Sequence, residues 1–378
     1  MKLLRLHAVG YRSLRDATVR FDDMSVFIGA NAAGKSTVLD ALRFLHLGLV
    51  YRDFRPIVLG RGGIANLLWK GDETPRAELL VEAEDSVGRY EWRVRLVRDA
   101  HQFQVEEDVC QTTPGHPVTT LLSAANGEGF WHSGNDGTTK VQMRQEPTGC
   151  ALAAAAADAS FLGRALADFV GHWGFFDPNP FLLRNHSTGL ESTRFDSYGR
   201  NLAQTLFRLK RASPDDFEQV VGATQAILGL PGRIEPREND DRFDFVQHER
   251  GLQSPVHQTG VSSGTLRILA LMTAMVAAPE VELIGIEEPE NYVHPTALMP
   301  FVEHLVRAQA RVQVLVTTHS PLLLDCLDDP AAVHVVRRGD DGATRVVSES
   351  DGDAVRNALE QSGFRLGAFH ETRGFGAS

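Results

Sequence analysis

Apolar and polar positions change their spacing several times along the chain, and these changes predict a mixed α/β fold. Near the N-terminus, apolar residues in two stretches, 2–9 and 17–29, are flanked by turn residues and predict two strands. A loop that contains glycine follows the second strand. Apolar residues near helical spacing then predict a helix from about Gly34 to Gly48, where the second glycine is the expected stop.

Alternation of apolar and polar residues replaces this spacing in the middle of the chain. Residues 76–104 predict an antiparallel meander, and more short strands are expected within 103–145. The alanine-rich segment 150–170 favours helix, and a second helical stretch spans about 199–228. Ser213, which precedes a proline, interrupts this stretch and would cap its second helix.

Strands and helices alternate in the last third of the chain, which implies a parallel sheet. We expect the N-terminal segment to begin this sheet and the last third to complete it. The expected elements are helices at 264–278, 296–309 and 321–327 and strands at 281–286 and 312–318. The expected division of the chain is a split α/β core of residues 1–70 and 255–378, an antiparallel β lobe of residues 71–148, and an inserted, mainly helical lobe of residues 149–254.

Composition and charge narrow the classes of function. The 378 residues include 38 basic and 49 acidic side chains, a formal net charge of −11, so any contact with DNA must be local. Three cysteines without a CxxC spacing fit a reducing compartment. The N-terminal segment carries charges where a signal peptide needs an apolar stretch, and no apolar run reaches membrane-spanning length. We therefore expect a soluble, cytoplasmic protein without a membrane partner.

The loop after the second strand has the sequence GANAAGKS, which satisfies the pattern GxxxxGK[ST]. In such a loop, backbone N–H groups wrap phosphate oxygens, Lys35 reaches the β and γ phosphates, and the Ser36 hydroxyl ligates Mg²⁺. The expected nucleotide-binding residues are Gly29, Asn31, Ala32, Ala33, Gly34, Lys35, Ser36 and Thr37.

Two buried strands of the last third end in polar side chains. LIGIEEPE carries Glu287 and Glu288, which would place one acid on magnesium and the next near an attacking water. QVLVTTHSP carries His319, whose imidazole would hydrogen-bond a γ phosphate or that water. Taken alone, the acids are as readily solvated loop residues, and a lone histidine is more often structural. The phosphate loop in the same chain favours the catalytic interpretation.

A third motif, VSSGTLR, precedes an apolar helix. Ser262 and Gly264 at this helix start offer a hydroxyl, free N–H groups and a favourable helix dipole to an anion. Taken alone, this spacing favours an ordinary helix cap.

Together and in this order, GANAAGKS, VSSGTLR, LIGIEEPE and THS resemble the phosphate loop, signature, magnesium-binding strand and switch histidine of ABC-type ATPases. More narrowly, LRLHAVGYRSLRDATVRF, SSGTLRILAL and EEPENYVHP resemble the RecF, SMC and OLD-like group, especially its compact AAA-family ATPases. The strong motifs lie near the two ends of the chain, and the middle matches only loosely. The resemblance implies a P-loop NTPase fold of the ABC/RecF-like head type, with a mixed sheet, an antiparallel β lobe and an inserted helical lobe.

The resemblance also implies roles for the motif residues. Two ATP molecules would be sandwiched in a head-to-tail dimer, or in a larger assembly, with Ser262 and Gly264 acting on the nucleotide of the partner copy. Glu287, which stands where the wider family usually has aspartate, would lie at the magnesium ion together with the phosphate-loop serine. Glu288 would be the general base, and His319 would sense the γ phosphate.

The chain departs from the family pattern in three respects. No glutamine occurs between Ser36 and Gln102, so the Q-loop glutamine has no counterpart in its expected place. The inserted region has neither the heptads nor the CxxC hook of the long coiled-coil members. After His319 there is no glutamate strand followed by a DxD strand, as a TOPRIM nuclease would need, so we expect any nuclease on another chain.

The implied function is that of an ATPase in DNA repair and recombination or in anti-phage defence, with DNA or a separate nuclease or toxin effector as partner. A second hypothesis is a nucleotide-gated scaffold that sequesters or releases an effector, in which turnover is incidental. Transport with a permease is a weaker third hypothesis. Two arginine clusters would either contact DNA phosphates or form solvated salt bridges: Arg52, Arg55 and Arg61, and Arg89, Arg93, Arg95 and Arg98.

Overall fold

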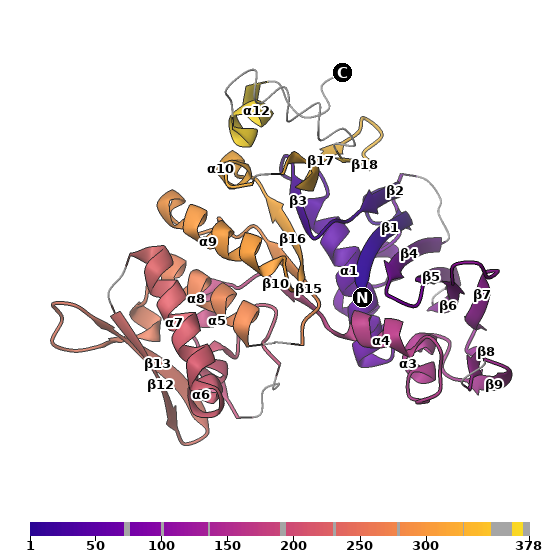
Figure 1. Ribbon diagram of the computed structural model, residues 1–378, viewed down its shortest axis with the longest axis horizontal. Coiled ribbons are helices and arrows are strands. Elements are labelled where there is room, and N and C mark those ends of the chain that lie inside the picture. The colour runs from indigo at the N-terminus through magenta and orange to yellow at the C-terminus, as the bar shows by residue number, and fades with distance from the viewer. Residues whose placement is uncertain are drawn as a thin grey trace. The chain divides into compact units, whose positions relative to one another are not determined.

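The structure is a computed structural model, drawn in Figure 1. It describes residues 1–71, 76–99, 102–134, 137–189, 194–229, 232–277, 280–327, 329–348 and 365–372. Within these ranges the chain divides into two units, which are treated separately below. The first unit contains residues 1–173 and 331–348, and the second contains residues 174–330 and 365–372.

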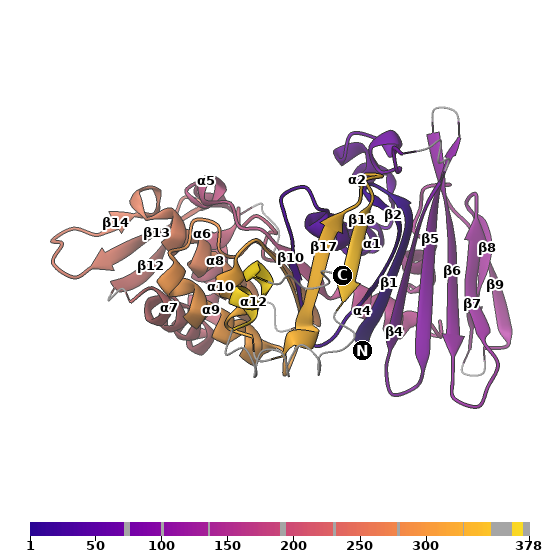
Figure 2. The ribbon, with the colours of Figure 1, turned by 90° about the horizontal axis from the view of Figure 1, so that it is seen from above.

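An eight-stranded antiparallel sheet forms much of the first unit, and Figure 2 shows its strands side by side. Alternation builds it: in one strand Trp92, Val94 and Leu96 are buried, and they alternate with Arg93 and Arg95. The meander predicted from the sequence is therefore confirmed. In spatial order the strands are β2 (Leu14–Arg20), β1 (Lys2–Tyr11), β4 (Arg76–Glu84), β5 (Arg89–Asp99), β6 (Gln102–Thr112), β7 (Thr119–Ala125), β8 (Glu128–Ser133) and β9 (Thr139–Arg144).

Three further strands of this unit form a mixed arrangement. The fully buried β3 (Met24–Ile28) pairs in parallel with β17 (Val333–Arg338), which pairs antiparallel with β18 (Thr344–Ser348). The single strand expected over 17–29 is wrong: the chain makes two strands there, β2 and β3, in different sheets. The polar pair at 22–23 separates them.

Helices α1 (Lys35–Tyr51), α2 (Arg55–Gly60), α3 (Ala151–Ala155) and α4 (Arg164–Gly171) complete the first unit, with a 3₁₀ turn η1 (Ile64–Asn66). The stop expected at Gly48 is wrong, because α1 continues to Tyr51. Gly48 lies within the helix and leaves space for the ring of Phe54, because a Cβ at this position would lie 2.0 Å from that ring. The helix ends where Arg52 adopts a left-handed conformation with φ 59°.

The second unit carries the predicted strand and helix alternation. Strands β15 (Leu283–Glu287) and β16 (Gln313–Thr318) pair in parallel, with Glu287 opposite Thr317, and β10 (Trp173–Phe176) lies next to β15. The predicted parallel pairing is therefore confirmed. The helices and turns of this unit are α5 (Pro180–Leu183), α6 (Leu202–Ala212), α7 (Pro214–Leu228), η2 (Gln258–Gly260), α8 (Ser263–Val276), α9 (Pro295–Ala308), α10 (Pro321–Leu324), η3 (Pro330–Ala332) and α12 (Leu366–Thr372).

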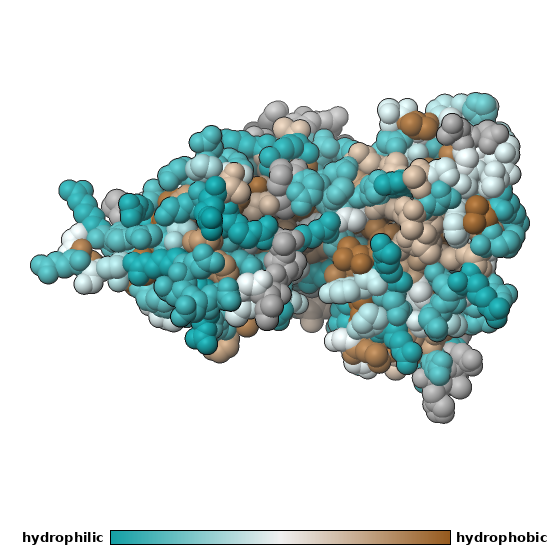
Figure 3. All heavy atoms as spheres, turned by 90° about the horizontal axis from the view of Figure 1, so that it is seen from below, coloured by the Kyte–Doolittle hydropathy of each residue, from teal (hydrophilic) through white to brown (hydrophobic). Residues whose placement is uncertain are grey.

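A β hairpin that the sequence pattern did not predict lies within residues 149–254, where helices were expected. Strands β12 (Gly232–Asn239) and β13 (Arg242–Glu249) pair along their whole length, and β11 (Ser187–Thr188) and β14 (Val256–His257) each pair with β13. Figure 1 shows this hairpin beside α6, and hydrophilic side chains cover most of it on the face drawn in Figure 3. Ser213 precedes α7 as expected, but its side chain makes no capping hydrogen bond.

Two further observations bear on function. No helix in the described part of the chain is long and apolar enough to cross a membrane. The three cysteines, Cys110, Cys150 and Cys326, are free thiols.

Candidate functional site

The phosphate loop of the first unit connects β3 to α1, as the sequence predicts. Both glycines of the loop are required, because other atoms lie where a side chain would have to begin. A Cβ on Gly29 would lie 2.1 Å from the carbonyl oxygen of Val336, and a Cβ on Gly34 would lie 2.0 Å from Oγ1 of Thr344. Gly34 also has φ 109°, a conformation that side chains rarely adopt. The tight loop therefore depends on these glycines.

The first turn of α1 suits an anion. In the described part of the chain no side chain caps this helix, and none of the residues in its first turn is acidic, so the helix itself places no carboxylate against its dipole and free N–H groups. Lys35 is only 4% exposed and donates hydrogen bonds to the carbonyl oxygens of Gly29, at 2.8 Å, and Ala30, at 3.1 Å. The Ser36 side chain is exposed at the same turn. These groups fit a nucleotide phosphate with its magnesium ion.

The remaining loop residues of the predicted set surround this turn. Asn31 and Ala32 are exposed, and Ala32 has a left-handed backbone with φ 61°. Ala33 is buried, and its carbonyl oxygen lies 2.8 Å from the Thr344 hydroxyl. Thr37 accepts a hydrogen bond from the Ser13 hydroxyl at 3.2 Å.

Thr344, at the start of β18, and Ser13, in the turn between β1 and β2, hold the loop. The Thr344 hydroxyl lies 2.8 Å from the Ser13 hydroxyl, and the Thr344 N–H donates to the Ser13 carbonyl oxygen at 2.8 Å. Sequence reasoning did not identify either residue. Only the pairing of β18 with β17, next to β3, brings the threonine to the loop.

A partly buried carboxylate lies one turn further along α1. Asp40 accepts hydrogen bonds from Tyr11, at 2.8 Å, from Arg12, at 2.8 Å, and from Arg61, the shortest at 2.6 Å. Burial would raise the pKa of the Asp40 carboxyl, but Arg61, Arg12 and the Tyr11 hydroxyl outweigh it and lower the pKa. The cluster joins α1 to β1 and to the segment after α2.

The second unit holds the two acids at the end of β15. Glu287 is the last residue of this strand. Glu288 follows it with a left-handed backbone, φ 43°, and its N–H donates to the carbonyl oxygen of Thr317 at 2.9 Å. A non-glycine residue in this conformation is strained, which is typical of functional positions.

The side chains of Glu288 and His319 meet within hydrogen-bonding distance just after the ends of neighbouring strands. His319 Nε2 lies 2.9 Å from Oε1 of Glu288, and Asn291 donates to the other carboxylate oxygen at 2.7 Å. The two side chains are 28% and 32% exposed, so both remain open to a ligand. The carboxyl ends of parallel strands meet at one edge of a sheet, which is why the sequence pattern could predict this pair.

Glu290, which the sequence pattern did not single out, holds the backbone of His319 in place. Its Oε1 accepts hydrogen bonds from the Thr318 hydroxyl, at 2.7 Å, and from the His319 N–H, at 2.6 Å. The third glutamate of the EEPE motif therefore orients the backbone that carries His319.

Ser262 and Gly264 form the start of α8. The Ser262 hydroxyl oxygen accepts a hydrogen bond from the Thr265 N–H at 3.1 Å, which is the ordinary cap that the spacing alone favours. Ser262 is nevertheless exposed. A Cβ on Gly264 would lie 2.7 Å from the carbonyl oxygen of Tyr292, so the loop after Glu288 packs closely on the first turn of α8.

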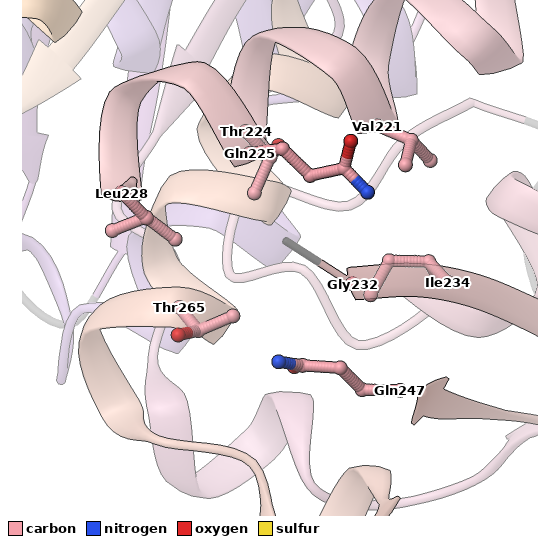
Figure 4. A pocket seen from close by; sticks show the side chains of 8 residues that line it. All are labelled: Val221, Thr224, Gln225, Leu228, Gly232, Ile234, Gln247 and Thr265. Atoms are coloured by element: carbon pink, nitrogen blue, oxygen red, sulfur yellow. The ribbon is translucent and has the colours of Figure 1, made fainter. Parts of the chain in front are cut away.

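A small hollow lies on the other side of this turn. Residues of α7, β12, β13 and α8 line it, and Figure 4 shows the Thr265 and Gln247 side chains at one side of it. Its volume is about 10 Å³, room for about one water molecule, and most of the exposed lining is apolar. The hollow is therefore unsuited to a nucleotide phosphate.

The arginine clusters are largely engaged in ion pairs. Arg95 lies 2.9 Å from Glu78 and 3.0 Å from Asp108, and Arg89 and Arg93 also pair with glutamates of β4. Arg61 belongs to the Asp40 cluster. These pairs support the salt-bridge interpretation for the arginines concerned.

Comparison with known proteins decides the family. Residues 24–325 match the family described as "AAA domain, putative AbiEii toxin, Type IV TA system". The chain belongs to this AAA-domain family. A curated relative, the OLD nuclease of Thermus scotoductus, is 22% identical over 398 residues, which cover 98% of this chain and 68% of the relative.

Solved structures agree on the fold. An SMC head bound to the C-winged helix domain of ScpA has a TM-score of 0.60 at 13% identity, covering 94% of this chain and all of that one. An SMC head with an extended coiled coil, bound to the C-terminal domain of ScpA from Pyrococcus furiosus, has a TM-score of 0.58 at 12% identity, covering 95% and 99%. The resemblance to ABC-type and SMC-like P-loop ATPases and the predicted fold class are thus confirmed.

Proposed function

We propose that the protein binds ATP with Mg²⁺ and hydrolyses it in a head-to-tail dimer. The observation that carries hydrolysis is the 2.9 Å pair between Glu288 and His319 at the ends of β15 and β16. The fit of the phosphate loop to an anion supports nucleotide binding. The family to which the chain belongs and its SMC-like fold agree with both.

Each residue would contribute a defined step. Lys35 would leave the loop carbonyls for the β and γ phosphates, and its charge would stabilise the charge that develops during transfer. Ser36 and Glu287 would hold Mg²⁺, which supplies further charge neutralisation. Glu288 would take a proton from the attacking water, and His319 would donate a hydrogen bond to the γ phosphate.

The signature residues would complete the site of a second copy. Ser262 is exposed at the start of a 14-residue helix, so its hydroxyl and the helix dipole can face an anion outside the chain. In this proposal Ser262 and Gly264 of one copy contact the nucleotide held by the phosphate loop of the other. ATP would therefore close the dimer and hydrolysis would reopen it.

We further propose a role in DNA repair and recombination or in anti-phage defence. The family description mentions a toxin of a toxin–antitoxin system, and the curated relative is named a nuclease. DNA or a separate nuclease or toxin effector is the partner that fits these names. The alternative is a scaffold that holds or releases such an effector according to nucleotide occupancy.

A mixing experiment tests the dimer and the assigned residues together. Lys35→Ala and Ser262→Arg should each hydrolyse little ATP alone. Mixed, they should recover part of the hydrolysis, because a heterodimer contains one site that combines an intact phosphate loop and base from one chain with an intact signature from the other. The matched control mixes Lys35→Ala with Glu288→Gln and should not recover, since the base acts on the nucleotide of its own chain.

Recovery in the control as well, or in neither mixture, would refute the head-to-tail arrangement. The scaffold alternative is tested with Glu288→Gln alone. If trapping the ATP state preserves the biological output, occupancy suffices; if it abolishes the output, the cycle is required.

A further inference from the structure

Arg267 is the charged residue most completely buried near the candidate site. It lies in α8, five positions after Ser262, and is 1% exposed. A guanidinium carries several fixed donors and no acceptor, so burial requires several acceptors around it. The acceptors around the Arg267 guanidinium therefore identify the segments of the chain that this side chain holds in place.

The acceptors around Arg267 include the backbone of both candidate acids. Its Nη2 donates to the carbonyl oxygen of Glu287 at 2.7 Å and to that of Glu288 at 2.9 Å. Nη2 also lies 3.1 Å from Oδ1 of Asp177, and Nη1 donates to the carbonyl oxygen of Pro178. One side chain of the signature helix thus fixes the segment on which the proposed general base stands.

Glu288 needs such support because its backbone is left-handed, with φ 43°. Strained conformations of this kind persist only where surrounding contacts over-determine them. The bond from Arg267 restrains the carbonyl side of Glu288, and the bond to Thr317 restrains its N–H. Together they set the direction of the carboxylate toward His319.

A second arginine ties the same region to the start of α8. Arg184, at the end of α5, donates to the carbonyl oxygen of Val261 at 3.0 Å and to the Ser263 hydroxyl at 3.1 Å. The segment from Asp177 to Arg184 therefore contacts α8 in two places. Arg184 bonds to the start of the helix, and Asp177 and Pro178 bond to Arg267 one turn further along. A movement at Ser262 would be passed along a rigid helix to Arg267.

We infer that Arg267 is a positioning residue that couples the signature serine to the proposed general base. When the first turn of α8 engages a nucleotide, the Arg267 guanidinium moves with the helix and sets the backbone of Glu288 for proton transfer. This inference rests on the proposed hydrolysis by Glu288. It assigns to Arg267 a role in kcat and none in ATP binding.

The first test compares Arg267→Lys with Asp177→Asn. The lysine keeps the charge but cannot reach all the carbonyls, and we expect kcat to fall about tenfold with KM for ATP changed less than about twofold. Asp177→Asn is the matched control: it removes the ion pair but keeps the carbonyl bonds, so its kcat should stay within about twofold of wild type. Equal kcat in Arg267→Lys and wild type, or an equal loss in the control, would overturn the inference.

A double-mutant cycle separates coupling from stability. Ser262→Ala and Arg267→Lys act on one relay, so the double variant should have a kcat no lower than the worse single variant. If the fold-losses in kcat of the two single variants multiply in the double variant, the two residues act independently and the coupling is refuted.

Hydrogen exchange on the unmodified protein needs neither folding of a variant nor hydrolysis. With Mg²⁺ and a non-hydrolysable ATP analogue, protection should rise together at Thr265–Leu266 and at Glu288–Asn291. Any other result, a change at one segment alone or at neither, would overturn the relay. If wild type hydrolyses no ATP, the proposed function is refuted, but the hydrogen-exchange result still decides whether the two segments are coupled.

Discussion

Glu107 gives the first unit a pH-dependent stability that can be measured. This residue of β6 is fully buried, and its carboxylate accepts hydrogen bonds from the Ala151 N–H, from the Leu152 N–H at 3.3 Å and from the Trp92 indole at 3.0 Å. The Cys150 thiol lies 3.7 Å away. Burial outweighs these donors and raises the pKa of Glu107 from its ordinary value of 4.5 to about 7.

The sign of the effect follows from that pKa. An acid whose pKa is higher in the folded state than in the unfolded state stabilises the fold at low pH, where it is protonated in both. That contribution is lost as pH rises through 4.5 toward 7. Between these two pKa values the loss amounts to about 3 kcal/mol in the free energy of unfolding.

The experiment compares wild type with Glu107→Gln in urea at about pH 4 and about pH 8, which lie on the two sides of the titration. Three of the four tryptophans, Trp69, Trp92 and Trp131, lie within the first unit and Trp173 lies at its boundary, so tryptophan fluorescence mainly follows the unfolding of this unit. Wild type should lose about 3 kcal/mol relative to the variant between the two pH values. Glu106→Gln, which changes the partly exposed neighbour, is the control and should keep the wild-type pH dependence. An identical pH dependence in wild type and Glu107→Gln would refute the reasoning.

Three further predictions concern the candidate site. Gly34→Ala should weaken ATP binding at least about tenfold, because a Cβ would lie 2.0 Å from Thr344 Oγ1 at a φ of 109°; calorimetry that finds an unchanged Kd would contradict this. Asp40→Asn should lower the free energy of unfolding by about 2 kcal/mol, because two arginines would lose a partly buried counter-charge that accepts their hydrogen bonds, and urea unfolding checks it. His319→Ala should reduce kcat about a hundredfold while ATP still binds, since the group facing Glu288 at 2.9 Å is removed. An unchanged kcat in His319→Ala would show that the pair is structural.

Features carried by consecutive residues were predictable from the sequence. The phosphate loop is one such feature, because its glycines, Lys35 and Ser36 lie in a single run with its own spacing. The pair of Glu288 and His319 was also predictable, because each residue follows a buried strand and parallel strands end at one edge.

Contacts between distant residues were not predictable from the same pattern. Thr344 reaches the phosphate loop across 311 residues, and Arg267 reaches the backbone after β15 from helix α8. Nothing in the local sequence marks either contact. Glu290 was overlooked because its role is to bond the backbone of His319 rather than a ligand. The β12–β13 hairpin was missed because β12 contains Pro236 and several charges, which weaken the alternation that indicates a strand.

The central claim is that ATP bound at the phosphate loop closes a dimer. Light scattering after gel filtration tests it most directly, with wild type, Lys35→Ala and Glu288→Gln each run with and without Mg-ATP. We expect Glu288→Gln to dimerise or assemble further only with ATP, and Lys35→Ala not to respond to ATP. A mass of Glu288→Gln that ATP leaves unchanged would refute the ATP-closed dimer.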